Sequence, residues 1–213
     1  MLSLVNIKTS RIKNRVNLVF SDGNYLPFFI DDVVRMSLAK YQELTPEKLD
    51  EIKSLCLLYL GKEYALRQIS ISPKAEKILF QKLKIFFYKK TQKFKLLSTS
   101  PIDPITNQII TQLKEKRLLN QSDFVDYFIK KNKSKSVFEI KYLLKQQGID
   151  TLSLNIPSDN ENQSIKKILS KKHINRDILS DYNLKNKLYA SLFRRGFTMS
   201  AIKTAIDEYL SLQ

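Results

Sequence analysis

The stretch that decides the fold reads LYASLFRRGF and occupies residues 188–197. It repeats the pattern of IKYLLKQQGI at residues 140–149, with an offset of 48 residues. A period of this length is longer than a helical hairpin and suits a module of three helices that bury their apolar faces against one another. The pattern therefore predicts tandem three-helix repeats.

Both copies end in a glycine followed by an apolar residue, Gly148-Ile149 and Gly196-Phe197. A helix commonly ends at a left-handed residue, where glycine escapes the Cβ penalty, and the next apolar side chain packs back onto the last turn. We expect each glycine to end a helix. Ile149 and Phe197 should then be buried against that end, and stacking on a base is the alternative role of Phe197.

Other segments carry helix-start signals, which are side chains that can satisfy free backbone N–H groups. Thr45-Pro46 offers an N-cap followed by proline at the first helical position. The Ser136–Glu139 and Ser158–Glu161 segments have the spacing of a capping box. Further starts are predicted at Ser72-Pro73, Asp103-Pro104, Ser122 and Thr198. From residue 31 onward, after the first strand pair, the chain is thus predicted to consist of helices and short turns.

The first thirty residues follow the pattern of a β-hairpin. Apolar residues at positions 16, 18 and 20 precede Asp22-Gly23, and an apolar run follows at residues 25–30. Pro27 cannot donate a hydrogen bond to a sheet, so the second strand should lie at an edge or be short. The predicted organisation is a hairpin and linker element (1–45) followed by three-helix modules at 46–100, 101–156 and 157–213.

The composition is that of a folded, strongly cationic protein. The 213 residues include 37 Lys or Arg against 21 Asp or Glu, so the formal net charge is +16, and 43% of the residues are hydrophobic. This apolar fraction supports a packed core, and the charge predicts a polyanionic partner such as nucleic acid. A compositional bias from A/T-rich coding is the alternative source of the charge, because Ile and Asn are abundant together with Lys.

The sequence indicates a cytoplasmic protein. Cys56 is the single cysteine, which excludes an intrachain disulfide and a secreted disulfide scaffold. The first residues lack a basic region followed by an apolar one, and no run approaches the roughly 18 apolar residues of a membrane span. We therefore expect neither export nor membrane insertion.

The sequence offers few residues that could act in catalysis or bind a cofactor. His173 is flanked by lysines and is interpreted as a solvated surface residue, while Cys56 lies on an apolar helix face and is interpreted as a buried structural thiol. Four scattered glycines cannot form a phosphate loop, and one His with one Cys cannot form a metal site. The adjacent Asp31-Asp32 are expected at a helix start. We predict a protein that is not an enzyme and needs no cofactor.

Basic residues gather in three successive runs, one in each predicted module. A lysine-rich solvated helix face is the alternative interpretation of any one run. Arg194 and Arg195 are the most specific pair, because a guanidinium fork binds phosphate or carboxylate bidentately. An intramolecular ion pair with Asp207 or Glu208 is their alternative role. The candidate partner- and DNA-binding residues are Lys82, Lys84, Lys130, Lys131, Lys141, Lys145, Lys187, Arg194 and Arg195.

Three tyrosines accompany these runs, and each has an aromatic face on which a base could stack. They are Tyr127, Tyr142 and Tyr189. Their helical spacing favours packing in the core or at its boundary.

At this point the sequence resembles the RecX family of bacterial regulators of the RecA recombinase, as a divergent member. Residues 192–198 are similar to the family's arginine-glycine-phenylalanine signature, and Gln147-Gly148-Ile149-Asp150 resembles its lysine-glycine-isoleucine-aspartate element. Residues 113–119 look like the junction between its first two modules, with Asn120-Gln121 standing where paired aspartates are usual. Arg15-Val16-Asn17-Leu18 resembles its variable N-terminal strand.

The resemblance implies a partner that composition cannot show. It implies an elongated, curved body that lies in the groove of a RecA filament on single-stranded DNA and regulates filament growth, most often as an inhibitor. The associated processes are DNA repair, recombination and the SOS response. We also expect non-specific binding to single-stranded and double-stranded DNA, no membrane partner, and a monomer.

Two other functions stay open at this stage. A sequence-specific or general DNA-binding protein of helical type would use a basic helix in the major groove, although no helix rich in Asn, Gln and Arg is evident. A membrane-surface protein would need exposed large apolar residues, whereas here these residues fall on core stripes.

Overall fold

A four-stranded antiparallel sheet opens the chain in this computed structural model, which describes residues 2–157 and 159–211. Its strands are β1 (Ser3–Thr9), β2 (Arg15–Phe20), β3 (Tyr25–Phe29) and β4 (Gln42–Glu43), in the order β3-β2-β1-β4. The predicted hairpin is confirmed as β2 and β3, and Pro27 lies on the edge strand β3 as expected. Strands β1 and β4 were not predicted.

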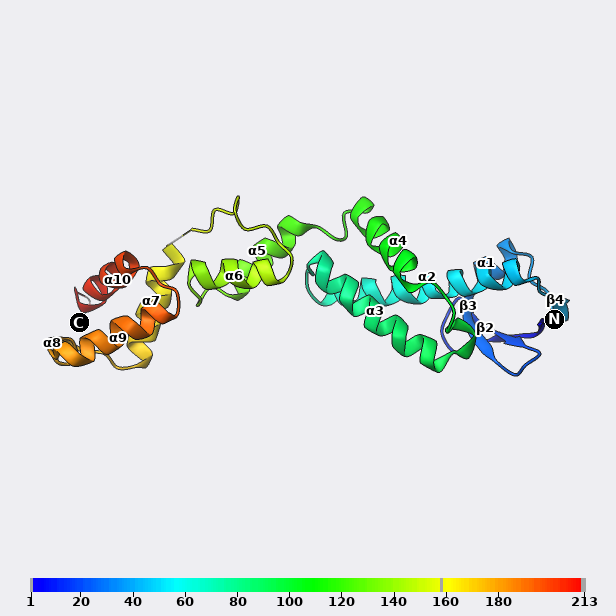
Figure 1. The fold of residues 1–213 in the computed structure, drawn as a ribbon, viewed down its shortest axis with the longest axis horizontal. Helices are drawn as coiled ribbons and strands as arrows, with labels where there is room; N and C mark the ends of the chain where they lie inside the picture. The colour runs from blue at the N-terminus through cyan, green and yellow to red at the C-terminus, as the bar shows by residue number, and fades with distance from the viewer. Residues whose placement is uncertain (1, 158, 212–213) are drawn as a thin grey trace. The chain divides into compact units, whose positions relative to one another are not determined.

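The first compact unit, Met1–Asn120, joins this sheet to a set of helices of different lengths. These are α1 (Ile30–Arg35), α2 (Pro46–Ile71), α3 (Glu76–Lys93) and α4 (Ile102–Glu115), with a short 3-10 turn at Lys95–Leu97. Helix α2 contacts β3 at one end and packs against α3 and α4 along the rest of its length (Figure 1). One apolar core runs through the unit, from Leu4 and Phe28 in the sheet to Leu83 and Ile109 in the helices.

Gly61 lies where side chains of α3 and α4 press against the backbone of α2. A Cβ at that position would lie 2.5 Å from both Ile109 Cδ1 and Phe87 Cζ, so even alanine would force its neighbours apart. Helix α4 is therefore held tightly on α2 and α3. The predicted division had placed residues after 100 in a second module, and that division stays a prediction.

Two predicted helix starts in this unit differ from the structure, and one is confirmed. Thr45 Oγ1 accepts a hydrogen bond from the backbone N–H of Lys48 at 3.3 Å, as an N-cap should. Helix α3 begins at Glu76, four residues after Ser72. Both Ser72 and Ala75 have extended backbone dihedrals, so the predicted start falls in the connection between α2 and α3. Ala75 is buried in that connection. Helix α4 begins one residue before Asp103, which therefore lies within its first turn.

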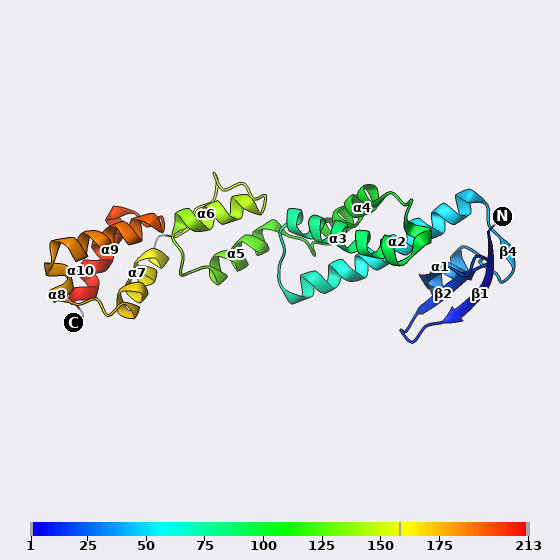
Figure 2. The ribbon, with the colours of Figure 1, turned by 60° about the horizontal axis from the view of Figure 1, so that its bottom comes forward.

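The second compact unit, Gln121–Gln213, contains helices and connecting segments and has no strand among its described residues. It contains α5 (Gln121–Lys131), α6 (Val137–Gln146), α7 (Asp159–Lys171), α8 (Arg176–Ser180), α9 (Tyr182–Arg194) and α10 (Met199–Ser211). Helices α5 and α6 pack on each other, while α10 packs on α7 and α9 around an apolar core of its own (Figure 2). The fold class is thus confirmed as mainly helical with a small N-terminal β element.

The repeated glycines end their helices as predicted. Gly148 has φ +84° and Gly196 has φ +82°, both in the left-handed region. The backbone N–H of Ile149 bonds the carbonyl of residue 144, and that of Phe197 bonds the carbonyl of residue 192. Ile149 and Phe197 are buried, at 5% and 2% exposure, so both act as apolar plugs.

No helix in the described part of the chain combines the length and the apolar character that crossing a bilayer requires. The longest, α2, spans 26 residues but carries charged side chains along its length.

Candidate functional site

The candidate lysines of the first unit are engaged in contacts within the protein. Lys82 Nζ donates to Gln68 Oε1 at 2.9 Å. Lys84 Nζ lies 2.9 Å from a carboxylate oxygen of Asp103 and 5.7 Å from the centre of the Phe80 ring. Contacts to another molecule would therefore compete with contacts already made.

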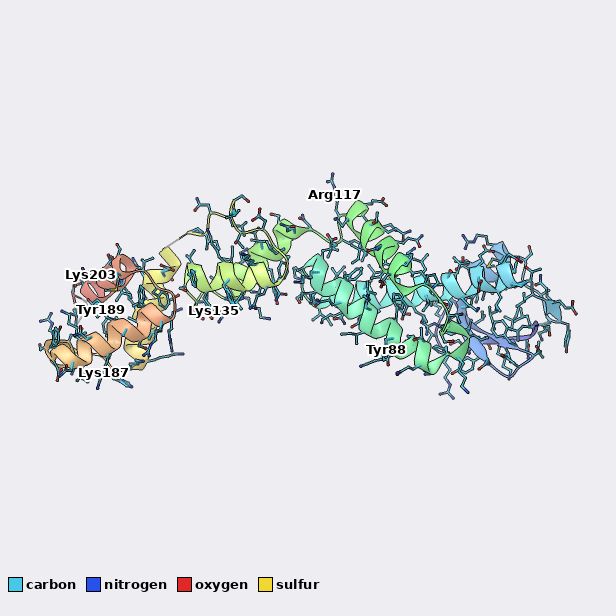
Figure 3. The ribbon with its side chains drawn as sticks, in the orientation of Figure 1. Tyr88, Arg117, Lys135, Lys187, Tyr189 and Lys203 are labelled. Atoms are coloured by element: carbon cyan, nitrogen blue, oxygen red, sulfur yellow. The ribbon has the colours of Figure 1, made fainter. Side chains whose placement is uncertain are left out.

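The remaining candidate lysines lie on several helices of the second unit. Lys130 and Lys131 end α5, with the Lys131 ammonium 5.7 Å from the centre of the Tyr127 ring. Lys145 is exposed in the last turn of α6, Lys141 is half-buried on the same helix, and Lys187 is exposed on α9. Figure 3 shows Lys187 on α9 and Lys203 on α10. These lysines thus come from three different helices.

Arg194 and Arg195 do converge with other residues, on a hollow of about 270 Å³. We call it the arginine hollow, and its lining residues are Phe138, Glu139, Tyr142, Arg194, Arg195 and Gly196. It lies where helix α6 meets the turn between α9 and α10. The structure thus joins a segment near residue 140 to a segment near residue 195, which are the two copies of the repeated pattern.

The aromatic rings of this hollow face solvent. Phe138 is 70% exposed and Tyr142 is 55% exposed, although the spacing of Tyr142 predicted packing. The residues on the buried face of α6 are Ile140 and Leu144. Phe138 lies two positions before Ile140, which is about 200° around a helix and so on the opposite face. An aromatic residue off the apolar stripe was the sequence signal for Phe138, and the sequence analysis missed it.

The charge of the arginine hollow is positive. Neither guanidinium group forms an ion pair within the described chain, and Glu208, one predicted alternative partner, instead pairs with Lys166 at 2.6 Å. The carboxylate that lines the hollow, Glu139, forms an ion pair with Lys135. The two arginines are therefore left with their donors available.

Ser136 positions both sides of the arginine hollow. Its hydroxyl accepts a hydrogen bond from the N–H of Glu139 at 3.1 Å, which confirms the predicted N-cap, and donates to the carbonyl oxygen of Arg195 at 2.7 Å. A Cβ on Gly196 would lie 2.8 Å from Ser136 Oγ and 2.9 Å from Phe138 Cδ1. Glycine is thus required twice at this position, for its φ and for its lack of a side chain.

Glu161 acts on helix α6, whereas its spacing from Ser158 predicted a capping box on α7. Ser158 lies outside the described residues. The buried carboxylate of Glu161, 4% exposed, accepts a hydrogen bond from the N–H of Val137 at 2.6 Å. Ser164 Oγ donates to the carbonyl oxygen of Lys133 at 2.6 Å. Helix α7 thereby fixes the start of α6 through side chains distant in sequence.

A larger hollow of about 540 Å³ adjoins the arginine hollow and shares Phe138 and Gly196 with it. Its other lining residues include Lys141, Glu161 and Thr204. Lys141 is the basic residue among those that line this second hollow, and Glu161 contributes a carboxylate, one oxygen of which accepts the Val137 N–H.

The residues that sequence analysis had set aside as catalytic candidates have structural roles. Cys56 is fully buried and its Sγ donates to the carbonyl oxygen of Pro27 at 3.2 Å. Burial raises the pKa of this thiol to about 12, which opposes nucleophile chemistry. Asp31 and Asp32 lie in the first turn of α1, where Asp32 pairs with Arg35. Among the described residues no His, Cys, Asp and Glu side chains group as a metal site.

Comparison with known proteins identifies the family. The family model described as "RecX, third three-helix domain" matches residues 159–206, which include α7, α8, α9 and both arginines. The Regulatory protein RecX of Clostridium beijerinckii is 31% identical over 211 residues, covering 95% of this chain and 92% of its own length. The chain belongs to the RecX family.

Other RecX proteins support this assignment. The Regulatory protein RecX of Streptococcus mutans is 29% identical over 206 residues, covering 92% of this chain and 74% of its own length. A crystal structure titled as regulatory protein RecX superposes with a TM-score of 0.63 at 19% identity, covering 97% of this chain and 100% of that one. The crystal structure of RecX from Lactobacillus salivarius has a TM-score of 0.52 and covers 72% of this chain and 96% of its own. These structures share the fold of this RecX chain.

Proposed function

We propose that this protein regulates the RecA recombinase in the cytoplasm, as an inhibitor that binds in the groove of the RecA filament on single-stranded DNA and limits its growth. Membership of the RecX family supports the regulatory role. The structural observation that carries the proposal is the pair Arg194 and Arg195, whose guanidinium groups have no carboxylate partner in the described chain.

Electrostatics supports a nucleoprotein partner. The net charge of +16 attracts a polyanion from a distance, and phosphate contacts release counterions, which supplies most of the affinity for nucleic acid. Two guanidinium forks on one turn suit phosphate or carboxylate oxygens, both of which a filament of protein and DNA presents. Lys130, Lys131, Lys145 and Lys187 would add further contacts from exposed positions.

Individual contributions should differ between the two units. Lys82 and Lys84 already bind Gln68 and Asp103. A contact with a partner would replace these interactions, so it should add less binding free energy than a contact made by an unpaired side chain. We therefore propose Arg194, Arg195 and Lys141 as the principal contacts and the lysines of α3 as secondary ones.

Co-sedimentation tests the proposal. The protein is mixed with RecA filaments assembled on single-stranded DNA and, separately, with bare single-stranded and double-stranded DNA at equal phosphate concentration. We expect preferential binding to the filament and a decrease in RecA ATP hydrolysis. A preference for one duplex sequence over the filament would instead support a sequence-specific DNA-binding protein.

A further inference from the structure

The arginine hollow combines two surface features that need an explanation together. Phe138 and Tyr142 expose 70% and 55% of their surface on one face of α6, and two arginines face them from the turn after α9. A cluster of large exposed apolar side chains indicates a binding surface, because single exposed apolar residues are common but contiguous patches are rare on a monomer. Here the cluster is held in place by the hydrogen bond from Ser136 to Arg195.

The charges around these rings favour an anionic ligand. Arg194 and Arg195 are unpaired in the described chain, Lys141 lines the adjoining hollow, and Glu139 is engaged by Lys135. A ligand that satisfies both features has a flat apolar face and a negative group a short distance away. A nucleotide of a single strand has this form, since its base is free to stack and its phosphate follows directly.

We infer that the arginine hollow binds one nucleotide of single-stranded DNA, with the base stacked on Phe138 or Tyr142 and the phosphate held by Arg194 and Arg195. This inference rests on the proposed function, because it names the part of the filament that the hollow contacts. The bases of a duplex are paired and stacked on one another, so the hollow selects single strands. Its volume of about 270 Å³ is below the usual ~300–1,000 Å³ of small-molecule sites, which suits one ring rather than a whole cofactor.

The test asks whether the ring of Phe138 contacts the base of the bound strand. Fluorescence anisotropy measures binding of the full chain to a labelled oligothymidylate and to a strand of equal length and charge whose positions are abasic. Phe138→Leu keeps an apolar side chain but removes the ring. We expect it to weaken binding of the oligothymidylate by about 5- to 150-fold and to leave binding of the abasic strand unchanged. Phe138→Trp should retain the wild-type preference.

A matched control separates stacking from a general loss of aromatic surface. Tyr182 is 77% exposed at the opposite end of α9 from Arg194, about 18 Å along the helix axis. Tyr182→Leu should bind both strands as the wild type does.

Three results would overturn the inference: no binding of the oligothymidylate by the wild type, equal losses on both strands for Phe138→Leu, or displacement by a polyglutamate peptide at lower concentration than by the oligothymidylate. The last would assign the hollow to an acidic protein segment. Co-sedimentation with RecA filaments is scored separately. A variant that loses the base preference but still sediments with filaments leaves the proposed function in place, whereas wild-type protein that stacks on bases but ignores filaments refutes only that function.

Discussion

The hydroxyl of Ser136 donates a hydrogen bond to the carbonyl oxygen of Arg195 at 2.7 Å, across 59 positions of sequence. The same hydroxyl caps helix α6 by accepting from the N–H of Glu139. The start of one helix and the end of another are therefore joined through a single side chain. The exposed aromatic rings of α6 and the arginines at the C-terminal end of α9 owe their proximity to this junction.

Gly196→Ala should destabilise the second unit by more than about 1 kcal/mol, because alanine at φ +82° is strained and its Cβ would also lie 2.8 Å from Ser136 Oγ. Gly23→Ala is the matched control, since Gly23 has φ +79° but no atom within 4 Å of the added Cβ. Urea unfolding of both variants measures the two costs, each from the transition of its own unit. Equal costs would show that the contact with Ser136 contributes nothing.

Glu161→Ala should destabilise the packing of α6 on α7 by about 1–3 kcal/mol, because the partly buried N–H of Val137 loses its charged acceptor. Glu161→Gln keeps an oxygen in the same place and should cost less. Hydrogen exchange at the Val137 amide reports this contact directly. Unchanged protection of that amide in Glu161→Ala would contradict the role given to the carboxylate.

Replacing Arg194 and Arg195 together by alanine should abolish suppression of RecA ATP hydrolysis while the protein stays folded. Both residues lie at the C-terminal end of α9, where a cation stabilises a helix by only about 0.3–1 kcal/mol. Replacement by two lysines should restore part of the activity, since lysine supplies charge without the bidentate fork. The double variant Lys82→Ala, Lys84→Ala is the control and should retain most suppression.

Raising the salt concentration from 50 to 200 mM should weaken binding to filaments by about 10³-fold or more if six or more phosphates are neutralised. The steepness of log affinity against log salt should fall by about 1 when both arginines become alanine, because the two side chains together hold one phosphate. Binding that does not change over this range would mean that the excess of lysine is compositional.

Cys56 should resist thiol reagents in the native state at pH 8, because burial raises the pKa of its thiol to about 12 and leaves the thiolate almost unpopulated. Because the pKa of the Cys56 thiol is raised, the folded protein holds this side chain as the uncharged thiol throughout the range around pH 7. The same reagent should react fully in 6 M guanidinium chloride. Rapid labelling of folded protein would contradict the buried position.

Local patterns were sufficient for the features that depend on neighbours in sequence. The Thr45 cap, the ends at Gly148 and Gly196 and the hairpin of β2 and β3 each follow from a few adjacent residues. Strand β1 escaped prediction because a bulge between Leu4 and Asn6 breaks its alternation, and its pairing with β4 joins distant residues.

The candidate site shows the same limit. Arg194 and Arg195 were selected for their chemistry. Phe138 was missed although its position off the apolar stripe was a sequence signal, and its proximity to Gly196 came only from the structure. The Glu161 carboxylate accepts a hydrogen bond from the start of another helix, a contact that the local Ser158–Glu161 spacing did not predict. Contacts that span many residues depend on packing, which a pattern of adjacent residues does not encode.

The arginine hollow is built from two segments separated by about fifty residues, so it exists only while α6 and the turn after α9 are held together. A ligand that fills it must then bind the folded second unit in preference to the unfolded chain. By thermodynamic linkage, each tenfold excess of ligand over its dissociation constant adds about 1.4 kcal/mol to the stability of that unit. A bound ligand therefore stabilises the fold that forms the hollow. The melting temperature of the second unit should rise with ligand concentration, so it measures binding.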